Sequence, residues 1–333
     1  MSAGLHERLY PTARWAAVEY ALVPLPEDPP AAARLAIRAA EARIEPGFDG
    51  RAHAPVLART VEASPHLGRL IVNRQRAVGI ALWSAHRSLL GLRLAWLHLE
   101  GEHATTDTYR WAIDEVDRTV ADVAFVAGPL AGLAPEDEER TMRSLRFAPF
   151  ARSEMVLERS VERPIAPDDP RVAVRRVRPE DEAGLARLHE AAYRGRFDRY
   201  LFLEDVDPRR DALRHTADMM HGRWGTLLPE GSTVAEEDGR VVGGVLTVRT
   251  PRGPLIVDVE TAPDRAGRGV ARAALSSALY GLAPYGLGRP FLNVTDENRR
   301  AYRLYEGLGF ARRLGPSREW YRTTCISATP HGD

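Results

Sequence analysis

Hydrophobic positions in the second half of the chain recur with two periods, which mark the expected elements. Alternating or continuous apolar runs predict strands, and apolar residues three and four positions apart predict helices. Strands are expected at 172–177, within a meander at 232–262, at 290–295 and at 319–323. Helices are expected at 179–193, at 211–221, from a glycine-rich turn to 282, and at 296–310. This order predicts an α/β (α+β) fold with a mixed, mostly antiparallel sheet flanked by helices.

The first half repeats this order in a weaker form. "RAVGIAL" at 76–82 lines up with "RVVGGVL" at 240–246, and "LRFA" at 145–148 lines up with "LGFA" at 308–311. The two matches are separated by nearly the same distance, 164 and 163 positions. A shared offset predicts a duplicated domain, although short matches of this kind also arise by chance.

A proline-rich segment divides the two halves. "ERSVERPIAPDDPRVAV" at 158–174 contains three prolines and two adjacent aspartates between strand-like runs, which is typical of a linker. We therefore predict domains at 1–160 and 172–333, joined by a linker at 161–171.

Composition and charge narrow the classes of function. The 333 residues are 44% hydrophobic and 28% charged, an ordinary mixture for a globular protein of two domains. Acidic and basic residues number 46 each, so no net charge attracts nucleic acid or an anionic membrane, and neither is an expected partner. No apolar run has the length of a membrane span or signal peptide, so we expect a cytoplasmic protein. The single cysteine, Cys325, allows no internal disulfide or cysteine cluster, and no metal is expected.

The turn at Gly267 and Gly269 is the clearest candidate binding site. It follows a β-branched run and leads into an alanine-rich helix, so the unpaired N–H groups of the first helical turn suit a phosphate. Arg265 and Arg268 flank the turn and add positive charge. A dinucleotide-binding fingerprint requires glycine or alanine where this chain has Arg272, and the Walker A sequence is absent. A plain glycine-rich turn is the alternative interpretation.

Residues 172–323 resemble the GNAT superfamily of acyl-CoA-dependent N-acyltransferases. The family's loop has the form Gln/Arg-x-x-Gly-x-Gly/Ala, which this chain fits at Gly269 and Ala271. It departs at Ala266, with Arg265 one place earlier. "LNVTDENRRAYRLYEGLGF" at 292–310 is similar to the family's strand and helix that end in Leu-Tyr-Glu-x-x-Gly-Phe. Together with the repeat, the resemblance implies two tandem GNAT folds.

The same resemblance implies acetyl-CoA as the acyl donor, with its pyrophosphate on the glycine loop. Tyr305 matches the family's tyrosine that protonates or hydrogen-bonds the CoA sulfur. Asn298 matches an asparagine that contacts the CoA arm, and a helix N-cap is the alternative role. The expected cofactor-binding residues are Thr261, Arg265, Ala266, Gly267, Arg268, Gly269, Val270, Ala271 and Asn298.

Asp258 and Glu260 are the candidates for a general base. They alternate with valines along the strand before the loop, so both carboxylates project from one face. Because neighbouring carboxylates raise each other's pKa, this pair is suited to accepting a proton. A solvated polar strand face is the alternative, and some family members use no dedicated base.

The segment at 192–210 is expected to form the acceptor pocket. Its aromatic residues suggest pocket walls, while Asp198, Glu204 and Asp205 are candidates to hold a cationic amine. Helical aromatics also occur in ordinary cores, which is the competing interpretation. The expected substrate-binding residues are Tyr193, Phe197, Asp198, Tyr200 and Trp224.

The first half lacks the corresponding chemistry. No Gly-x-Gly follows its strand at 92–101, and the offset of 163 places Met142 opposite Tyr305 and Pro135 opposite Asn298. We expect this half to be non-catalytic. The sequence therefore favours transfer of an acetyl group from acetyl-CoA to a primary amine of a small molecule, by direct attack in a ternary complex. Protein amino-terminal or aminoglycoside-type antibiotic acetylation, or a non-catalytic acyl-CoA sensor or scaffold, are the alternatives.

Overall fold

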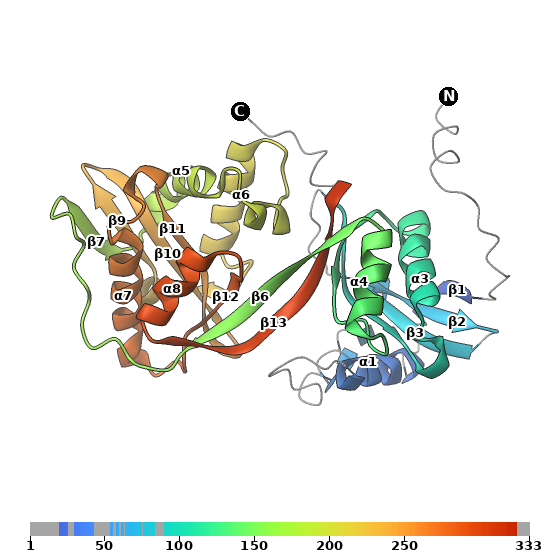
Figure 1. Ribbon diagram of the computed structural model, residues 1–333. Coiled ribbons are helices and arrows are strands. Elements are labelled where there is room, and N and C mark those ends of the chain that lie inside the picture. Colours follow the sequence, from blue (N-terminus) through green and yellow to red (C-terminus); the bar gives the residue numbers. More distant parts are fainter. Residues whose placement is uncertain are drawn as a thin grey trace, which may run out of the picture.

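The first half of the chain folds into strands and helices on one side of the molecule (Figure 1). The computed structural model describes residues 20–25, 30–42, 54–55, 58–59, 61–62, 64–74, 76–83 and 90–324, so Cys325 and the first nineteen positions lie outside the described residues. The strands are β1 (Tyr20–Pro24), β2 (Gly68–Asn73), β3 (Arg76–Trp83), β4 (Leu92–Leu99), β5 (Val123–Ala127) and β6 (Phe147–Leu157). The helices are α1 (Pro30–Ala42), α3 (Thr106–Thr119) and α4 (Pro135–Ser144).

The second half contains the elements that the sequence predicts, in the predicted order. Its strands are β7 (Val172–Arg176), β8 (Thr226–Leu227), β9 (Thr233–Glu237), β10 (Arg240–Thr250), β11 (Gly253–Thr261), β12 (Phe291–Thr295) and β13 (Phe310–Arg322). Its helices are α5 (Glu182–Tyr193), α6 (Pro208–Met220), α7 (Val270–Leu282) and α8 (Arg299–Gly307). The last strand is longer than the one predicted at 319–323.

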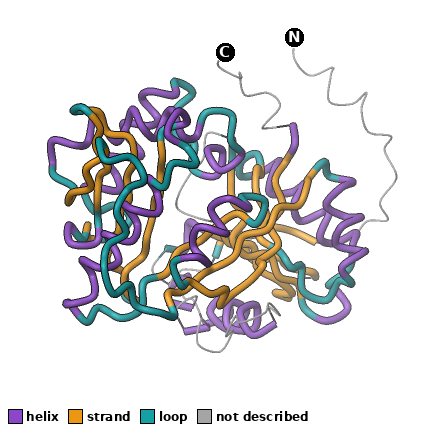
Figure 2. The backbone as a smooth tube through the Cα atoms, turned by 60° about the vertical axis from the view of Figure 1, so that its left-hand side comes forward, coloured by secondary structure: helices purple, strands orange, loops and turns teal. Residues whose placement is uncertain are grey.

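All these strands belong to one sheet. Their spatial order is β1-β2-β3-β4-β5-β13-β6-β12-β11-β10-β9-β7, with β8 beside β10. Among the described strands, β4 with β5 and β11 with β12 are the parallel pairs, and the other neighbours are antiparallel. The predicted fold class is therefore confirmed. Figure 2 shows the strands in two groups, with helices around each group.

The two short sequence matches occupy equivalent places in this sheet. β3 lies between β2 and β4, just as β10 lies between β9 and β11. The second match covers the starts of β6 and β13, each of which follows a helix, α4 or α8. The element order of the first half thus repeats in the second, as a duplicated domain requires.

The long strands β6 and β13 connect the halves by a reciprocal exchange (Figure 1). Near its end, β13 inserts between β5 and β6, where Glu319, Trp320 and Tyr321 pair with β5 on one side and β6 on the other. Residues 152–156 of β6 insert in the same way between β12 and β13. Each half therefore receives one strand segment from the other, which the sequence does not indicate.

The hydrophobic cores follow this exchange. Trp320 is fully buried in the core of the first half, with Tyr109, Phe147 and Met142. In return, Met155 of β6 lies in the core of the second half. The apolar faces of both strands thus bury surface on both sides of the molecule, which favours a single cooperative structure.

No helix among the described residues has both the length and the apolar composition needed to cross a membrane.

The exchange predicts that Trp320 stabilises the first half although it lies near the end of the chain. Trp320→Ala should lower the free energy of unfolding by about 3–5 kcal/mol, because it leaves a cavity in the core. It also removes the 2.7 Å hydrogen bond that the indole Nε1 donates to buried Glu138. Guanidinium unfolding followed by circular dichroism measures the loss.

Tyr280→Ala is the control, because Tyr280 is 47% exposed and its removal should change stability by less than about 0.5 kcal/mol. A loss below about 1 kcal/mol for Trp320→Ala would show that the first half does not depend on the inserted strand.

Candidate functional site

The site begins where β11 and β12 separate. Among the described residues these parallel strands are in register at Leu255 and Phe291 alone, while β11 continues to Thr261 along β10. Beyond Leu255, the β11 edge that faces away from β10 has no ladder partner in β12, so its backbone groups are available to an extended ligand. A cavity of about 620 Å³ opens here, lined by both strands, the glycine loop and α8.

The glycine loop joins β11 to α7 at the rim of this cavity. Gly267 and Gly269 have φ values of 86° and 72°, a left-handed conformation that favours glycine. Gly269 is also the N-cap of α7, so the first N–H groups of the helix face outward beside it. The outward-facing N–H groups have the geometry that suits an anion, so the loop stays the candidate phosphate site.

The arginines around the loop differ in their availability. Arg265 is engaged, because its Nε donates to Glu237 at 2.6 Å, whereas Arg268 is exposed. The sequence analysis missed Arg300, which lies on α8. If Gly267 carried a Cβ atom, that atom would lie 3.9 Å from Nη2 of Arg300. Arg300 lines the cavity together with all the expected cofactor-binding residues except Arg268, namely Thr261, Arg265, Ala266, Gly267, Gly269, Val270, Ala271 and Asn298.

The linker places a carboxylate directly against the loop. A Cβ on Gly269 would lie 2.6 Å from Oδ2 of Asp168, and Asp168 also lines the cavity. Arg272 of α7 donates to Asp168 at 3.0 Å. A negative group therefore lies next to the helix N-terminus, where an anion is stabilised.

Tyr305 and Asn298 lie on α8 at the wall of the cavity. Tyr305 is 8% exposed, and its burial, with the charge of Asp258, raises the pKa of its hydroxyl above the usual value. The phenol therefore keeps its proton at neutral pH. Asn298 is the N-cap of α8, since its Oδ1 accepts from the N–H of Ala301 at 3.2 Å.

Asp258 and Glu260 are buried on the same face of β11, where they share a histidine. Each is 5% exposed, and both point toward α5. Nδ1 of His189 lies 2.5 Å from Oε1 of Glu260 and 3.2 Å from Oδ2 of Asp258. The hydroxyl of Tyr193 donates to Asp258 at 2.9 Å. The alternative of a solvated strand face is therefore not what the structure contains.

The cluster perturbs the pKa values of its members in different directions. Burial alone would lower the pKa of His189, but the charges of Glu260 and Asp258 outweigh it and raise the value to about 10. Burial would raise the pKa of Asp258, but the hydrogen bond and charge of His189 lower it to about 2. Burial and the charge of Asp258 raise the pKa of Glu260 well above its usual range. Glu260 is thus the stronger proton acceptor of the two carboxylates.

His189 is the main residue that the sequence analysis missed. It lies four residues before Tyr193 on α5, so the two side chains share one face of the helix. The sequence shows this spacing of four residues. It does not show that His189 contacts two carboxylates on β11, which follow 69 and 71 positions later in the chain.

His215 completes one side of the cluster. Its ring centroid lies 4.7 Å from that of His189. His189, His215 and Asp258 each offer one ligand atom within 4.8 Å of the others, a set that is compatible with a cation. Within this set, His189 is also hydrogen-bonded to the carboxylates of Asp258 and Glu260.

The predicted acceptor residues fall into two groups. Tyr193 and Asp198 line the main cavity, and Asp198 accepts a hydrogen bond from Thr295. Trp224 lines an adjoining cavity of about 340 Å³. Phe197 and Tyr200 pack instead, Phe197 with its ring 5.0 Å from that of Phe150 and Tyr200 with 8% exposure. For these two aromatic residues, the structure therefore agrees with ordinary core packing and not with the pocket walls that the sequence suggested.

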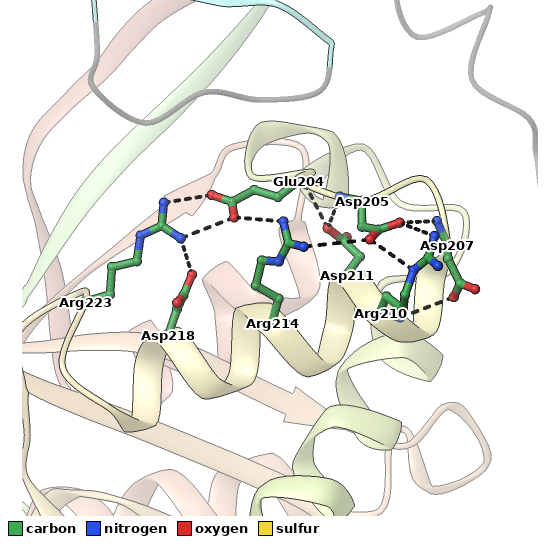
Figure 3. A network of polar contacts seen from close by, with 8 residues as sticks. All are labelled: Glu204, Asp205, Asp207, Arg210, Asp211, Arg214, Asp218 and Arg223. Carbon is green, nitrogen blue, oxygen red and sulfur yellow. Dashed lines mark hydrogen bonds and ion pairs between the residues drawn. The ribbon is translucent and has the colours of Figure 1, made fainter.

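The acidic residues before α6 form a network of their own (Figure 3). Glu204 pairs with Arg223 at 3.1 Å, and Asp205 pairs with Arg210 at the same distance. Arg214 lies within 4 Å of both carboxylates. These pairs fix the loop in front of α6, and neither Glu204 nor Asp205 is among the residues that line the main cavity.

Among the described residues of the first half, the positions that correspond to the glycine loop and to Tyr305 have a different structure. β4 and β5 pair at Leu92, Arg93 and Leu94, but the helix that follows, α3, begins with a side-chain cap. Oγ1 of Thr105 accepts from the N–H of Thr108 at 3.2 Å, which satisfies a donor that the glycine loop leaves open. Met142 is fully buried on α4, in the place that Tyr305 occupies on α8.

Comparison with known proteins gives a family match in the second half. Residues 191–310 match the model of the acetyltransferase (GNAT) family. Two curated relatives, both named mycothiol acetyltransferase, share 41% identity over 88 residues (Acidimicrobium ferrooxidans) and 40% over 86 residues (Thermomonospora curvata). Each match covers 25% of this chain, and 28% and 29% of the respective relatives.

Solved structures match over most of the chain. A GCN5-related N-acetyltransferase from Sphaerobacter thermophilus superposes with a TM-score of 0.63 and 22% identity, covering 91% of this chain and 94% of the other. A tandem GNAT protein from the clavulanic acid biosynthesis pathway gives a TM-score of 0.53 and 12% identity over 91% of this chain and 97% of the other. At these identities the likeness concerns the fold.

The buried cluster predicts an unusual titration of His189. Its imidazole should stay protonated up to a pH near 10, because the Glu260 and Asp258 carboxylates stabilise the cation. Glu260→Gln should lower this pKa by about one unit or more, since it removes one of the two charges. Nuclear magnetic resonance of ¹⁵N-labelled histidine measures both values, with His189→Gln to assign the signal.

His98 is an internal control, because burial lowers its pKa instead. Titration of His189 near the ordinary value of about 6.5 would contradict the arrangement of charges described here.

Proposed function

We propose that the chain transfers an acetyl group from acetyl-CoA to a primary amine of a small molecule, and that residues 191–310, which match the acetyltransferase (GNAT) family, belong to its catalytic domain. The second half, 172–333, would be the catalytic domain and the first half, 1–160, a degenerate GNAT-like domain without catalysis. The observation that carries the proposal is the meeting of four features in one cavity. These are the separated strands, the glycine loop, the Tyr305 hydroxyl and the carboxylate pair.

The fit of CoA rests on the loop and the β11 edge. Gly267 and Gly269 leave no side chain between the backbone N–H groups and a pyrophosphate, and the N-terminus of α7 favours the negative charge. Arg300 adds a cation from α8. The N–H groups of β11 near Glu260 and Thr261 would polarise the thioester carbonyl. Acetyl-CoA itself supplies the activated acetyl thioester.

Glu260 is proposed as the general base. Its raised pKa suits it to take a proton from the incoming ammonium group, directly or through water. His189 holds Glu260 and Asp258 in place and supplies the positive charge that keeps one carboxylate ionised. The neutral amine then forms the C–N bond as the C–S bond breaks, and the electron pair goes to sulfur. The proton that the new amide nitrogen loses restores the Tyr305 hydroxyl, directly or through water, after Tyr305 has given its own proton to the thiolate.

Tyr305 is proposed as the general acid. Its hydroxyl remains protonated at neutral pH, so it can donate to the thiolate that leaves. Asn298 lies two helical turns earlier and lines the same cavity. Its Oδ1 caps α8, which leaves its Nδ2 as the atom that would contact the CoA arm.

The size of the cavity bears on the kind of acceptor. A cavity of about 620 Å³ has the size of a small-molecule site, which favours such an amine over a protein amino terminus. The relatives named mycothiol acetyltransferase make an acceptor related to mycothiol one candidate class, and an aminoglycoside-type antibiotic is another. A non-catalytic acyl-CoA sensor is the alternative from a different class. We also expect a cytoplasmic protein that needs no metal.

Release of free thiol from acetyl-CoA across a panel of amines tests this proposal. We expect turnover with at least one small primary amine at neutral pH. Binding of acetyl-CoA without thiol release for any amine would favour the sensor.

Replacement of Tyr305 separates chemistry from binding. Tyr305→Phe should lower kcat by about a hundredfold, because the thiolate then leaves without a positioned proton. The Kd for CoA should change by less than about twofold, because the ring remains. Stopped-flow thiol release and calorimetry measure the two quantities. Tyr302→Phe is the matched control on the same helix, α8. The Tyr302 hydroxyl accepts a hydrogen bond from Nε of Arg312 and does not line the cavity. Equal kcat in wild type and Tyr305→Phe would remove Tyr305 from the acid role.

The position of Asp168 predicts that CoA binds against a local repulsion. Asp168→Asn should tighten CoA binding by about two- to fivefold at low salt, because a carboxylate no longer faces the pyrophosphate and Arg272 is released toward it. Calorimetry at low and high salt measures the gain, which should shrink as salt rises. Glu162→Gln, an exposed change elsewhere in the linker, is the control. Weaker binding by Asp168→Asn would indicate that the carboxylate orders the loop.

A further inference from the structure

The second cavity lies where the two halves of the chain meet. Its volume is about 340 Å³, and its lining includes Arg93 and Phe125 of the first half together with Trp224 of the second. Arg152 and His215 line both this cavity and the main one. The two spaces are therefore neighbours with a shared wall, and the smaller one, called here the interdomain chamber, extends away from the glycine loop.

Strand register explains why residues from both halves reach the chamber. Arg93 pairs with Phe125 across β4 and β5, and Phe125 is followed across the sheet by Tyr321 of β13. Glu319 lies two residues before Tyr321 on β13 and pairs with Phe150 of β6. Arg152 lies two residues after Phe150 on β6, so its side chain is on the same face of the sheet. The exchanged strands thus place arginines from β4 and β6 on one face of the continuous sheet.

The environment of Arg152 is partly buried and aromatic. Its guanidinium lies 5.8 Å from the ring centroid of Phe202. Burial lowers the pKa of Arg152, and the carboxylates of Glu319 and Asp198 act in the opposite direction. Glu319 itself pairs with Arg93. A guanidinium with reduced access to water is stabilised further by an anion that reaches it.

Charge is distributed unevenly between the two spaces. Around the carboxylate pair the main cavity is lined by Asp258, Glu260 and Asp198, whereas its lining near the glycine loop includes the arginines Arg265, Arg272 and Arg300. Among the described residues, the lining of the chamber includes Arg93, Arg152 and His215 but no carboxylate. A ligand that extends from the carboxylate pair into the chamber therefore meets an acidic region first and a basic one second.

From this distribution we infer that the acceptor carries an anionic group at the end opposite its amine, and that Arg152 and Arg93 bind this group in the interdomain chamber. The inference rests on the proposed function and adds a substrate class to it. The planar guanidinium fork matches a carboxylate or a phosphate, which share this chemistry. The aromatic rings of Phe125, Phe202 and Trp224 favour an apolar spacer between the two ends. The first half thus contributes to recognition although it lacks catalytic residues.

The test compares acceptors that differ at one end only. Three matched series of increasing length are used: ω-amino carboxylic acids, ω-aminoalkyl phosphonic acids and neutral n-alkylamines. At the best length, kcat/KM for one anionic series should exceed that of the matched alkylamine by at least about tenfold. The series that is preferred tells a carboxylate from a phosphate.

Variants of the arginines connect the preference to the chamber. Arg152→Met should raise KM for the anionic acceptor about tenfold or more and leave the neutral amine within about threefold, whereas Arg152→Lys should keep part of the preference. Arg93→Met should weaken the preference as well, since it leaves Glu319 unpaired beside the chamber. Arg176→Met, at the exposed end of edge strand β7, is the control. Circular dichroism and thermal unfolding verify that each variant folds.

A binding measurement separates this inference from the proposed function. Calorimetric titration of the anionic acceptor into the CoA-bound protein should give heat in wild type and Arg152→Lys, and little in Arg152→Met. If no amine releases thiol but anion binding depends on Arg152, the proposed reaction fails and the subsite stands. Turnover of amines without preference for an anionic end, or a preference that Arg152→Met leaves intact, would overturn the subsite and leave the reaction standing.

Discussion

The pairing of β6 with β13 is the constraint on which both halves depend. Each strand is long enough to lie in the sheet of its own half and to insert into that of the other. Because side chains on a strand alternate strictly, this register also decides which residues face the helices and which face the opposite core. It buries Trp320 in the first half and turns Arg152 toward the second. The cavity between the halves is a direct result.

A second constraint acts inside the second half of the chain, where charged groups are buried together. Asp258, Glu260 and His189 would each be costly to bury alone, but two acids around one base balance most of the charge. The divergence of β11 from β12 exposes this cluster to the cavity on one side. Strand geometry and buried charge thus act together, since the same strand that opens the groove carries both carboxylates.

Much of this was predictable from the sequence, because local patterns determine it. Alternation along β11 placed Asp258 and Glu260 on one face, and the glycines located the turn before α7. Long-range features were not predictable, because no local pattern encodes them. The exchange of strands, the contact of His189 with β11 and the approach of Asp168 to Gly269 each join residues far apart in the chain. The aromatic residues of 192–210 were ambiguous, and the structure divides them between cavity and core.

The order in which the chain is synthesised gives the exchanged strand a further consequence. The slot between β5 and β6 is filled by residues 319–321, close to the carboxyl terminus. During synthesis, the first half emerges first, yet its sheet lacks an inner strand until residues 319–321 have left the ribosome. Until then, two strand edges with unpaired backbone groups remain open to incorrect pairing. The first half is therefore completed only after most of the second half has been synthesised, and a chain that is terminated before β13 would leave it unfinished.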